Sequence, residues 1–145
     1  MKKSIMLIAI ALGVVVVIAA ACGSKTGTDG SVPTGKVIKA VTVENLTATL
    51  SNGTGQLKKG NQEITLAFTD GAGKAVDVGA VSLGFHMPQM GSMAAMTDSV
   101  TFTTTSTPGV YHGKVTLESG GEWQAQLAYE GPAGKGKTTF SLTAQ

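Results

Sequence analysis

The sequence predicts an all-β fold, an antiparallel sandwich of about seven short strands. Segments rich in Val, Ile and Thr alternate between apolar and polar residues, which is the pattern of half-buried strands. Turn signals containing Gly, Pro or Asp recur every ten residues or so. No apolar pattern in the predicted domain, residues 36–145, has the length and period of an amphipathic helix.

The N-terminal segment is typical of an export signal. Two lysines precede an apolar run over residues 5–21, and Cys22 follows a small-residue end. Ala-Ala-Ala-Cys resembles the lipobox of bacterial lipoproteins, which implies that Cys22 is lipidated; the alternative is an uncleaved N-terminal anchor. We therefore expect a lipoprotein signal peptide at 1–21 and a domain held on a membrane in the cell envelope, outside the cytoplasm.

The residues after the signal separate into a tether and a domain. Residues 22–35 are rich in Gly, Ser and Thr, as in a flexible tether, and residues 36–145 have the size of one domain. Without Lys2 and Lys3, nine Lys balance nine Asp plus Glu, and the chain has no Arg. This neutrality argues against nucleic acid as a partner. Since Cys22 is the only cysteine, the domain has neither a disulfide nor a thiolate metal site.

The first half of the domain contains three expected strands. Residues 37–51 are rich in β-branched side chains, and residues 63–70 alternate cleanly between apolar and polar positions. The sequence D-G-A-G-K-A-V at 70–76 is typical of a turn. Residues 80–85 are the third strand and lead into a methionine-rich segment.

The second half contains four expected strands, at 99–105, 110–117, 122–130 and 138–144. A turn signal stands before each of the last three strands. These signals are Pro108-Gly109, Gly120-Gly121 and the G-P-A-G-K-G-K of 131–137. Low aromatic content is compatible with this fold because Val, Ile, Leu and Thr fill the core.

The segment H-M-P-Q-M-G-S-M-A-A-M, residues 86–96, contains the strongest candidate site. Four of the six methionines of the chain recur here at a spacing of three, directly after a histidine. Thioether sulfur is soft and uncharged and needs no deprotonation, so several converging on one ion suit Cu(I) or Ag(I). We predict a Cu(I) site, with first-choice ligands Met87, Met90 and Met93 and alternates His86 and Met96.

Other roles for this segment stay open. Methionine is flexible and fills irregular gaps, so Met87 and Met90 could plug the end of the sandwich. Exposed methionine could also act as an oxidant sink. His112 lies on an expected strand, either inward and available to the methionines or solvated beside Lys114, whereas Trp123 is expected in the core.

Enzymatic motifs do not stand out. The serines lack a G-x-S-x-G elbow, and neither histidine has a sequence relation to an orienting acid. The acidic residues fall at expected turns or strand ends, where solvation and turn formation account for them. We therefore expect a protein that is not an enzyme.

Four segments together resemble the YtkA-like domain. They are D-G-A-G-K-A-V (70–76), A-V-S-L-G-F-H-M-P-Q-M-G (80–91), P-G-V-Y-H-G-K-V (108–115) and G-E-W-Q-A-Q-L (121–127). The family pattern has a D-x-x-G-x-P-V turn, an M-P-x-M-G segment, a G-x-Y strand start and a G-x-W strand. The resemblance covers roughly residues 44–142. The sequence departs from the family pattern at Ala75, where Pro is common in the family.

The resemblance implies an immunoglobulin-like sandwich in exported, often lipid-anchored proteins. The chain is also similar to FixH-like proteins linked to copper delivery and to domains found beside metal-efflux components. The resemblance thus implies copper delivery or buffering, with a copper-receiving or efflux protein as partner. The alternative is a metal-free interaction module of an envelope, oxidase-assembly or efflux complex, with the methionines as core plug or contact surface. Met87 and Met90 match the family motif, while Met93 and Met96 extend beyond it.

Overall fold

The computed structural model describes residues 35–145 of the chain. The predicted signal peptide, the lipidation site Cys22 and all of the predicted tether except Gly35 lie outside the described residues. Between residues 35 and 145 there is no helix, so this part of the chain offers none that could cross a membrane.

Nine strands form the described part of the chain. In chain order they are β1 (Lys36–Val43), β2 (Leu46–Asn52), β3 (Gly60–Thr69), β4 (Ala80–Met87), β5 (Met96–Ser99), β6 (Thr101–Thr104), β7 (Val110–Leu117), β8 (Gly121–Gly131) and β9 (Gly134–Ala144).

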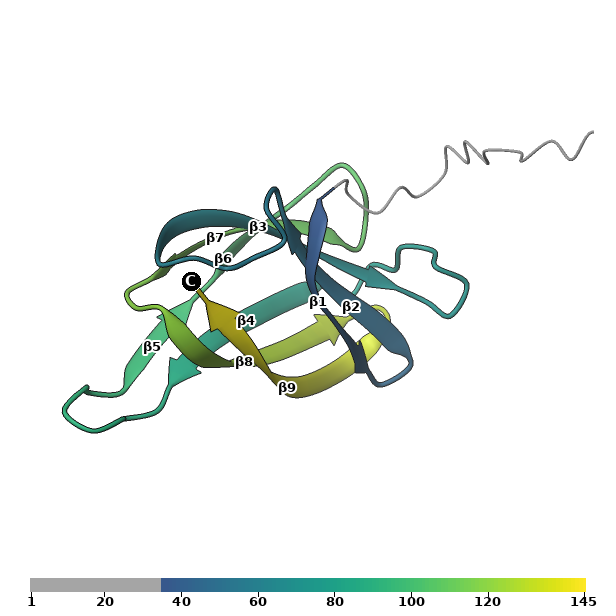
Figure 1. Ribbon diagram of the computed structural model, residues 1–145. Coiled ribbons are helices and arrows are strands. Elements are labelled where there is room, and N and C mark those ends of the chain that lie inside the picture. Colours follow the sequence, from purple (N-terminus) through teal and green to yellow (C-terminus); the bar gives the residue numbers. More distant parts are fainter. Residues whose placement is uncertain (1–34) are drawn as a thin grey trace, which may run out of the picture.

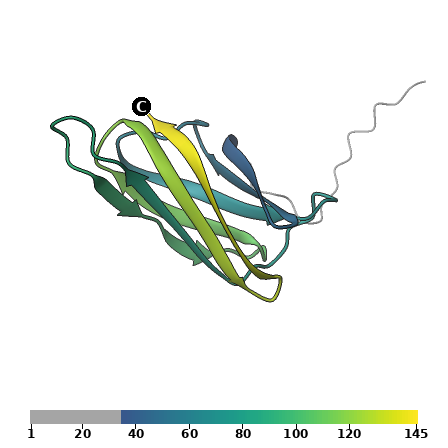
Figure 2. The ribbon, with the colours of Figure 1, turned by 90° about the horizontal axis from the view of Figure 1, so that it is seen from below.

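The strands build two sheets that pack face to face (Figures 1 and 2). One sheet has the order β1-β2-β3-β7-β6 and the other the order β5-β4-β8-β9. All neighbouring strands within each sheet are antiparallel. This arrangement confirms the predicted all-β antiparallel sandwich, in which alternate side chains of each strand face the other sheet.

The count rises from about seven strands to nine because two expected strands are each divided. The expected strand 37–51 is a hairpin of β1 and β2, joined by Glu44 and Asn45. Glu44 has φ 54°, a left-handed conformation that residues other than glycine adopt rarely. The turn contains neither Gly nor Pro, and its one turn-forming residue, Asn45, stands alone within a run of strand-forming residues.

The second division lies at Val100, where the chain passes from one sheet to the other. The Val100 N–H donates to the Leu83 carbonyl at 2.9 Å, which still belongs to the four-stranded sheet. Thr101 already pairs with Lys114 in the five-stranded sheet. Thus the expected strand 99–105 contributes the end of β5 and all of β6, and it closes one side of the sandwich.

The last turn is also shorter than expected. Residues 131–137 were predicted as a turn, but only Pro132 and Ala133 separate β8 from β9. Alternating Gly and Lys in this segment are accommodated in β9, with Gly136 lying directly over the Tyr129 ring. A side chain at Gly136 would collide with that ring, which explains a glycine inside a strand.

Aromatic side chains lie at the centre of the core. Trp123 is fully buried, which confirms its expected core position, and its indole N–H donates to the Ser119 carbonyl at 3.1 Å. Phe68 makes edge-to-face contacts with Tyr111 and Tyr129, with ring centroids 6.2 and 5.3 Å apart.

The hydroxyl of Tyr111 ties β7 to the segment before β4. It donates to the Gly79 carbonyl at 2.9 Å and lies 3.4 Å from the Asp77 carboxylate. Burial raises the pKa of Tyr111 above its ordinary value, and the Asp77 charge adds to this effect. The phenol therefore stays protonated and keeps its role as a donor.

Candidate functional site

The methionine segment folds as a β-hairpin that extends β4 and β5 beyond the sheet. Met87 lies opposite Met96 in the ladder, and Met90 lies opposite Met93 in an isolated bridge. Met90 and Met93 exchange both backbone hydrogen bonds, at 3.2 and 2.9 Å. The register is therefore the same from the sheet to the tip, and the four methionines form two cross-strand pairs.

A two-residue turn of Gly91 and Ser92 sets this register. Gly91 has φ 58°, and glycine at the first central position is what a type II′ hairpin turn requires. The turn places its two flanking residues, Met90 and Met93, directly opposite each other. Side chains opposite each other in an antiparallel pair have Cβ atoms about 5 Å apart, within reach of one another for flexible side chains.

The two methionine pairs have different environments. Met87 is 2% exposed and belongs to the core, where its Cε packs on Gly121, 3.3 Å from the position that a Cβ would take there. Met96 is half-buried and packs against the same core. In contrast, Met90 and Met93 are 57% and 44% exposed, although they are large apolar side chains.

Strand alternation accounts for this division. Met87 and Met90 are three residues apart, so a regular hairpin places them on opposite faces. The structure brings Met87 together with Met96 and Met90 together with Met93, and it separates the first-choice trio of ligands into one buried and two exposed residues. His86 faces away from Met87, with its Nδ1 at 3.4 Å from the Thr97 hydroxyl.

The hairpin projects from one end of the sandwich. In both ribbon views its tip lies apart from the two sheets and far from the point where the described chain begins (Figures 1 and 2). Residues 88–95 are all exposed, and the sequence from 78 to 97 contains no Asp, Glu, Lys or Arg. The tip is therefore an uncharged surface with two thioethers at its centre.

Asp98, which was expected at a solvated strand end, lies on the inner face of β5. It pairs with the core residue Phe85, and its Oδ2 is buried without a hydrogen-bond partner among residues 35–145. The sequence signal for this inward position is alternation, because Met96, Asp98 and Val100 share one face. An inward-pointing charge on a short edge strand is one way in which proteins prevent edge-to-edge aggregation.

Replacing Asp98 with threonine should raise the free energy of unfolding by about 1 kcal/mol. An unpartnered buried polar atom costs about 1–3 kcal/mol, and threonine suits a strand better than aspartate does. Urea unfolding monitored by Trp123 fluorescence measures the change. The exposed acid Glu122 in β8 supplies the control, because Glu122→Gln should stay within about 0.5 kcal/mol of the parent protein. A destabilised Asp98→Thr variant would show that the carboxylate has a favourable partner.

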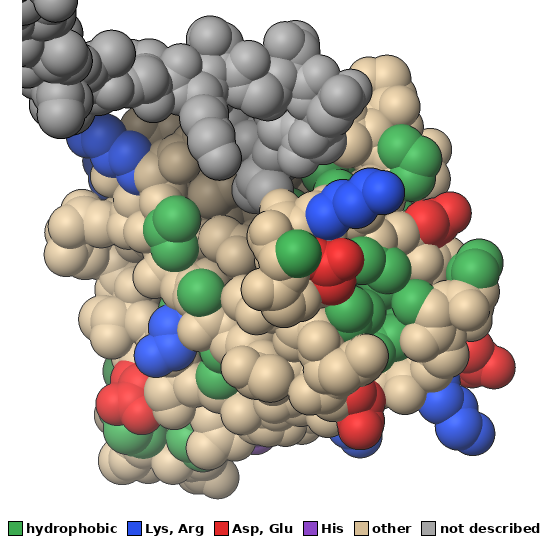
Figure 3. Space-filling model, turned by 90° about the vertical axis from the view of Figure 1, so that its right-hand side faces the viewer, with side chains coloured by type: hydrophobic (Ala, Val, Ile, Leu, Met, Phe, Trp, Pro, Cys, Tyr) green, Lys and Arg blue, Asp and Glu red, His purple; other side chains and the backbone are tan. Residues whose placement is uncertain are grey.

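The rest of the described surface carries few charged side chains. On the face shown in Figure 3, Lys and acidic side chains are scattered among uncharged ones and do not gather into a stripe. No group of three His, Cys, Asp or Glu side chains that could hold a metal ion occurs in residues 35–145. The candidate soft-metal donors are the exposed thioethers of Met90 and Met93 at the tip of the hairpin.

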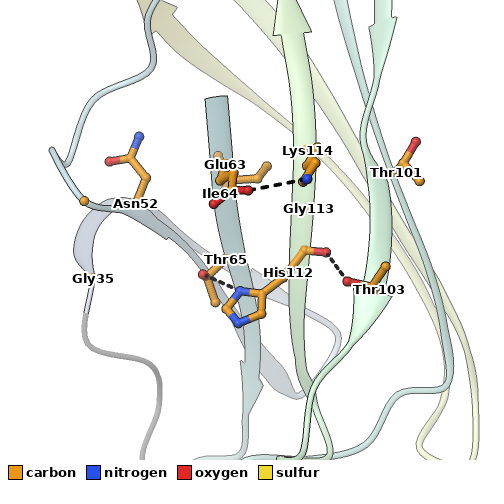
Figure 4. A pocket seen from close by; sticks show the side chains of 11 residues that line it. Gly35, Asn52, Glu63, Ile64, Thr65, Thr101, Thr103, His112, Gly113 and Lys114 are labelled. Carbon is orange, nitrogen blue, oxygen red and sulfur yellow. Dashed lines mark hydrogen bonds and ion pairs between the residues drawn. The ribbon is translucent and has the colours of Figure 1, made fainter. Parts of the chain in front are cut away.

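A hollow of about 630 Å³ lies on the outer face of the five-stranded sheet (Figure 4). His112 lies in it between two threonines, with Nδ1 at 3.2 Å from the Thr65 hydroxyl and its carbonyl accepting from Thr103. Lys114 and Glu63 form an exposed ion pair at 3.6 Å beside it. His112 is therefore solvated beside Lys114 on the outer face, the second of the two positions expected for it.

Comparison with protein-family models identifies a family for this chain. A family model described as YtkA-like matches residues 40–128, from β1 into β8, and this range includes the whole methionine hairpin. Neither the curated proteins nor the solved structures gave a match.

Proposed function

The chain belongs to the YtkA-like family, and from the exposed methionine pair of its hairpin we propose that it binds Cu(I) outside the cytoplasm. In this proposal the domain is held on a membrane through lipidated Cys22 and delivers or buffers copper in the cell envelope. The observation that carries the proposal is the position of Met90 opposite Met93, both exposed at the tip of the hairpin.

The chemistry of the tip suits a soft monovalent ion. Two neutral thioethers favour Cu(I) over hard ions such as Mg²⁺ or Ca²⁺, which require oxygen ligands. The sequence around them carries no acidic side chain that would attract hard cations. Met87 and Met96 support the site from below, because their burial anchors the base of the hairpin.

Release follows from the same geometry. Both sulfur ligands lie on the surface, so an acceptor can bring its own sulfur or imidazole to the ion while Met90 and Met93 still hold it. The thioethers then leave one at a time, and the ion is never free in solution. A copper-receiving or efflux protein is the partner that this ligand exchange requires.

The proposal is tested by removing the two sulfur atoms and keeping the apolar surface. Met90→Leu combined with Met93→Leu should weaken Cu(I) binding at least about tenfold, a loss of roughly 1.4 kcal/mol. Anaerobic titration against a competing Cu(I) chelator measures this affinity. Ser92→Ala, in the same turn but without loss of sulfur, is the matched control and should bind as the parent protein does.

A second candidate function, a metal-free interaction module, has support from the same exposure. Two large apolar side chains at 57% and 44% exposure also suit a contact surface for another protein. The leucine variant separates the two candidates, since it preserves an apolar contact. Unchanged Cu(I) affinity in the variant would contradict the copper site at Met90 and Met93 and favour the contact surface.

A further inference from the structure

The tip of the hairpin offers only two soft donors to a bound ion. Met90 and Met93 are the exposed pair, while the sulfur of Met87 is committed to the core. The other side chains of the tip carry no sulfur or imidazole; they are Pro88, Gln89, Gly91, Ser92, Ala94 and Ala95.

His86 does not complete the site. It is four residues before Met90, a separation of up to about 13 Å in an extended chain. Its ring lies beside Thr97 at the base of the hairpin. Cu(I) binds two, three or four soft ligands, unlike structural zinc, which is held by four. Two thioethers from one tip therefore leave room on the ion for further soft donors at the end of the molecule.

We propose that one Cu(I) ion bridges two copies of this chain, tip to tip, with Met90 and Met93 of each copy as the four ligands. This inference rests on the proposed function. A two-fold axis through the ion makes the contact self-complementary, so the same residues serve on both sides and the assembly closes as a dimer. Four thioethers then surround the ion, and the donor set is uniformly soft.

The charge and the side-chain sizes of the tip permit two tips to come into contact. Residues 78–97 contain no Asp, Glu, Lys or Arg, so two tips do not repel each other. Small residues form the turn, Gly91 and Ser92, and follow Met93 on one arm of the hairpin, Ala94 and Ala95. The tip also projects beyond both sheets, so the bodies of two sandwiches stay apart when the tips meet (Figure 1).

The contact between the two tips is too small to be stable without the metal ion. The tip comprises about eight residues a side, whereas a standard stable interface uses roughly 20–30 a side. Without the ion, the chain should therefore remain a monomer. Copper would then control both the occupancy of the site and the oligomeric state.

Native mass spectrometry of the full-length chain, released from detergent micelles under anaerobic conditions, tests this inference. Half an equivalent of Cu(I), or of redox-inert Ag(I) as a second probe, should convert most of the protein to a species of doubled mass holding one ion. Met90→Leu combined with Met93→Leu should stay monomeric with either ion, and Ser92→Ala should behave as the parent protein.

The other outcomes are distinguishable. A monomer that holds one Cu(I) would overturn the bridged dimer and leave the proposed function standing. Absence of any bound Cu(I) would remove both. A dimer that forms without metal, or that persists in the leucine variant, would show that apolar contact rather than the ion joins the copies.

Discussion

Replacing Gly109 with alanine is expected to destabilise the fold by about 3 kcal/mol or more. Gly109 precedes β7 with φ 84°, a left-handed conformation that costs other residues about 1–2 kcal/mol. A Cβ there would lie 2.6 and 2.9 Å from the carbonyl carbon and nitrogen of Val76, and closer still to its oxygen. Backbone atoms cannot rotate away as a side chain can, so the clash adds to the conformational cost.

Gly109 also contributes a hydrogen bond that the clash would disturb. Its carbonyl accepts from the Phe68 N–H at 2.9 Å, and Val76 in turn donates to the Phe68 carbonyl. A shift of Val76 to relieve the clash would therefore loosen the end of β3. Urea unfolding of Gly109→Ala measures the total effect.

Gly73→Ala is the matched control. Gly73 has nearly the same φ, 80°, but nothing lies within 4 Å of its Cβ position. Its replacement should cost only about 1–2 kcal/mol, the conformational part. Equal losses at the two positions would mean that Val76 moves aside freely and that the close approach has no energetic weight.

Local alternation was sufficient to predict most of the sandwich. The strand expected at 110–117 coincides with β7, since buried and exposed residues alternate from Tyr111 to Leu117 after a first buried residue, Val110. The divisions at Glu44 and Val100 depend on tertiary structure instead. A glutamate at positive φ carries no turn signal, and Val100 changes sheets within a stretch whose alternation continues unbroken.

For the candidate site, the residue types were predicted from the sequence, whereas the pairing of the methionines was missed. A spacing of three along the chain places the methionines in one segment, but the hairpin register decides which sulfurs meet. That register depends on the Gly91–Ser92 turn, and M-G-S-M already has the Gly-X pattern of a two-residue hairpin between two methionines. The burial of Met87 continues the alternation of Leu83 and Phe85 along β4, two residues beyond the expected end of that strand, and its Cε packs on Gly121 of β8.

Met87→Ala should lower the free energy of unfolding by about 2–4 kcal/mol, whereas Met90→Ala should change it by less than about 0.5 kcal/mol. Deleting a buried methionine side chain leaves a cavity, and Met87 is 2% exposed. Met90 is 57% exposed, and its replacement leaves no cavity in the core. Urea unfolding of the two variants measures both values, with Met87→Leu as a volume-conserving control that should cost less than about 1.5 kcal/mol.

The same two variants should affect stability and metal binding separately. At a temperature where Met87→Ala is folded, its Cu(I) affinity should equal that of the parent protein, because the exposed pair is intact. Met90→Ala should show the reverse, with parental stability and weakened binding. If Met90→Ala were as destabilising as Met87→Ala, the tip would be part of the core, and the plug role would extend to both methionines of the family motif. If Met87→Ala lost affinity while folded, its sulfur would belong to the site, and the hairpin would have to rearrange around the ion to bring the buried and exposed pairs together.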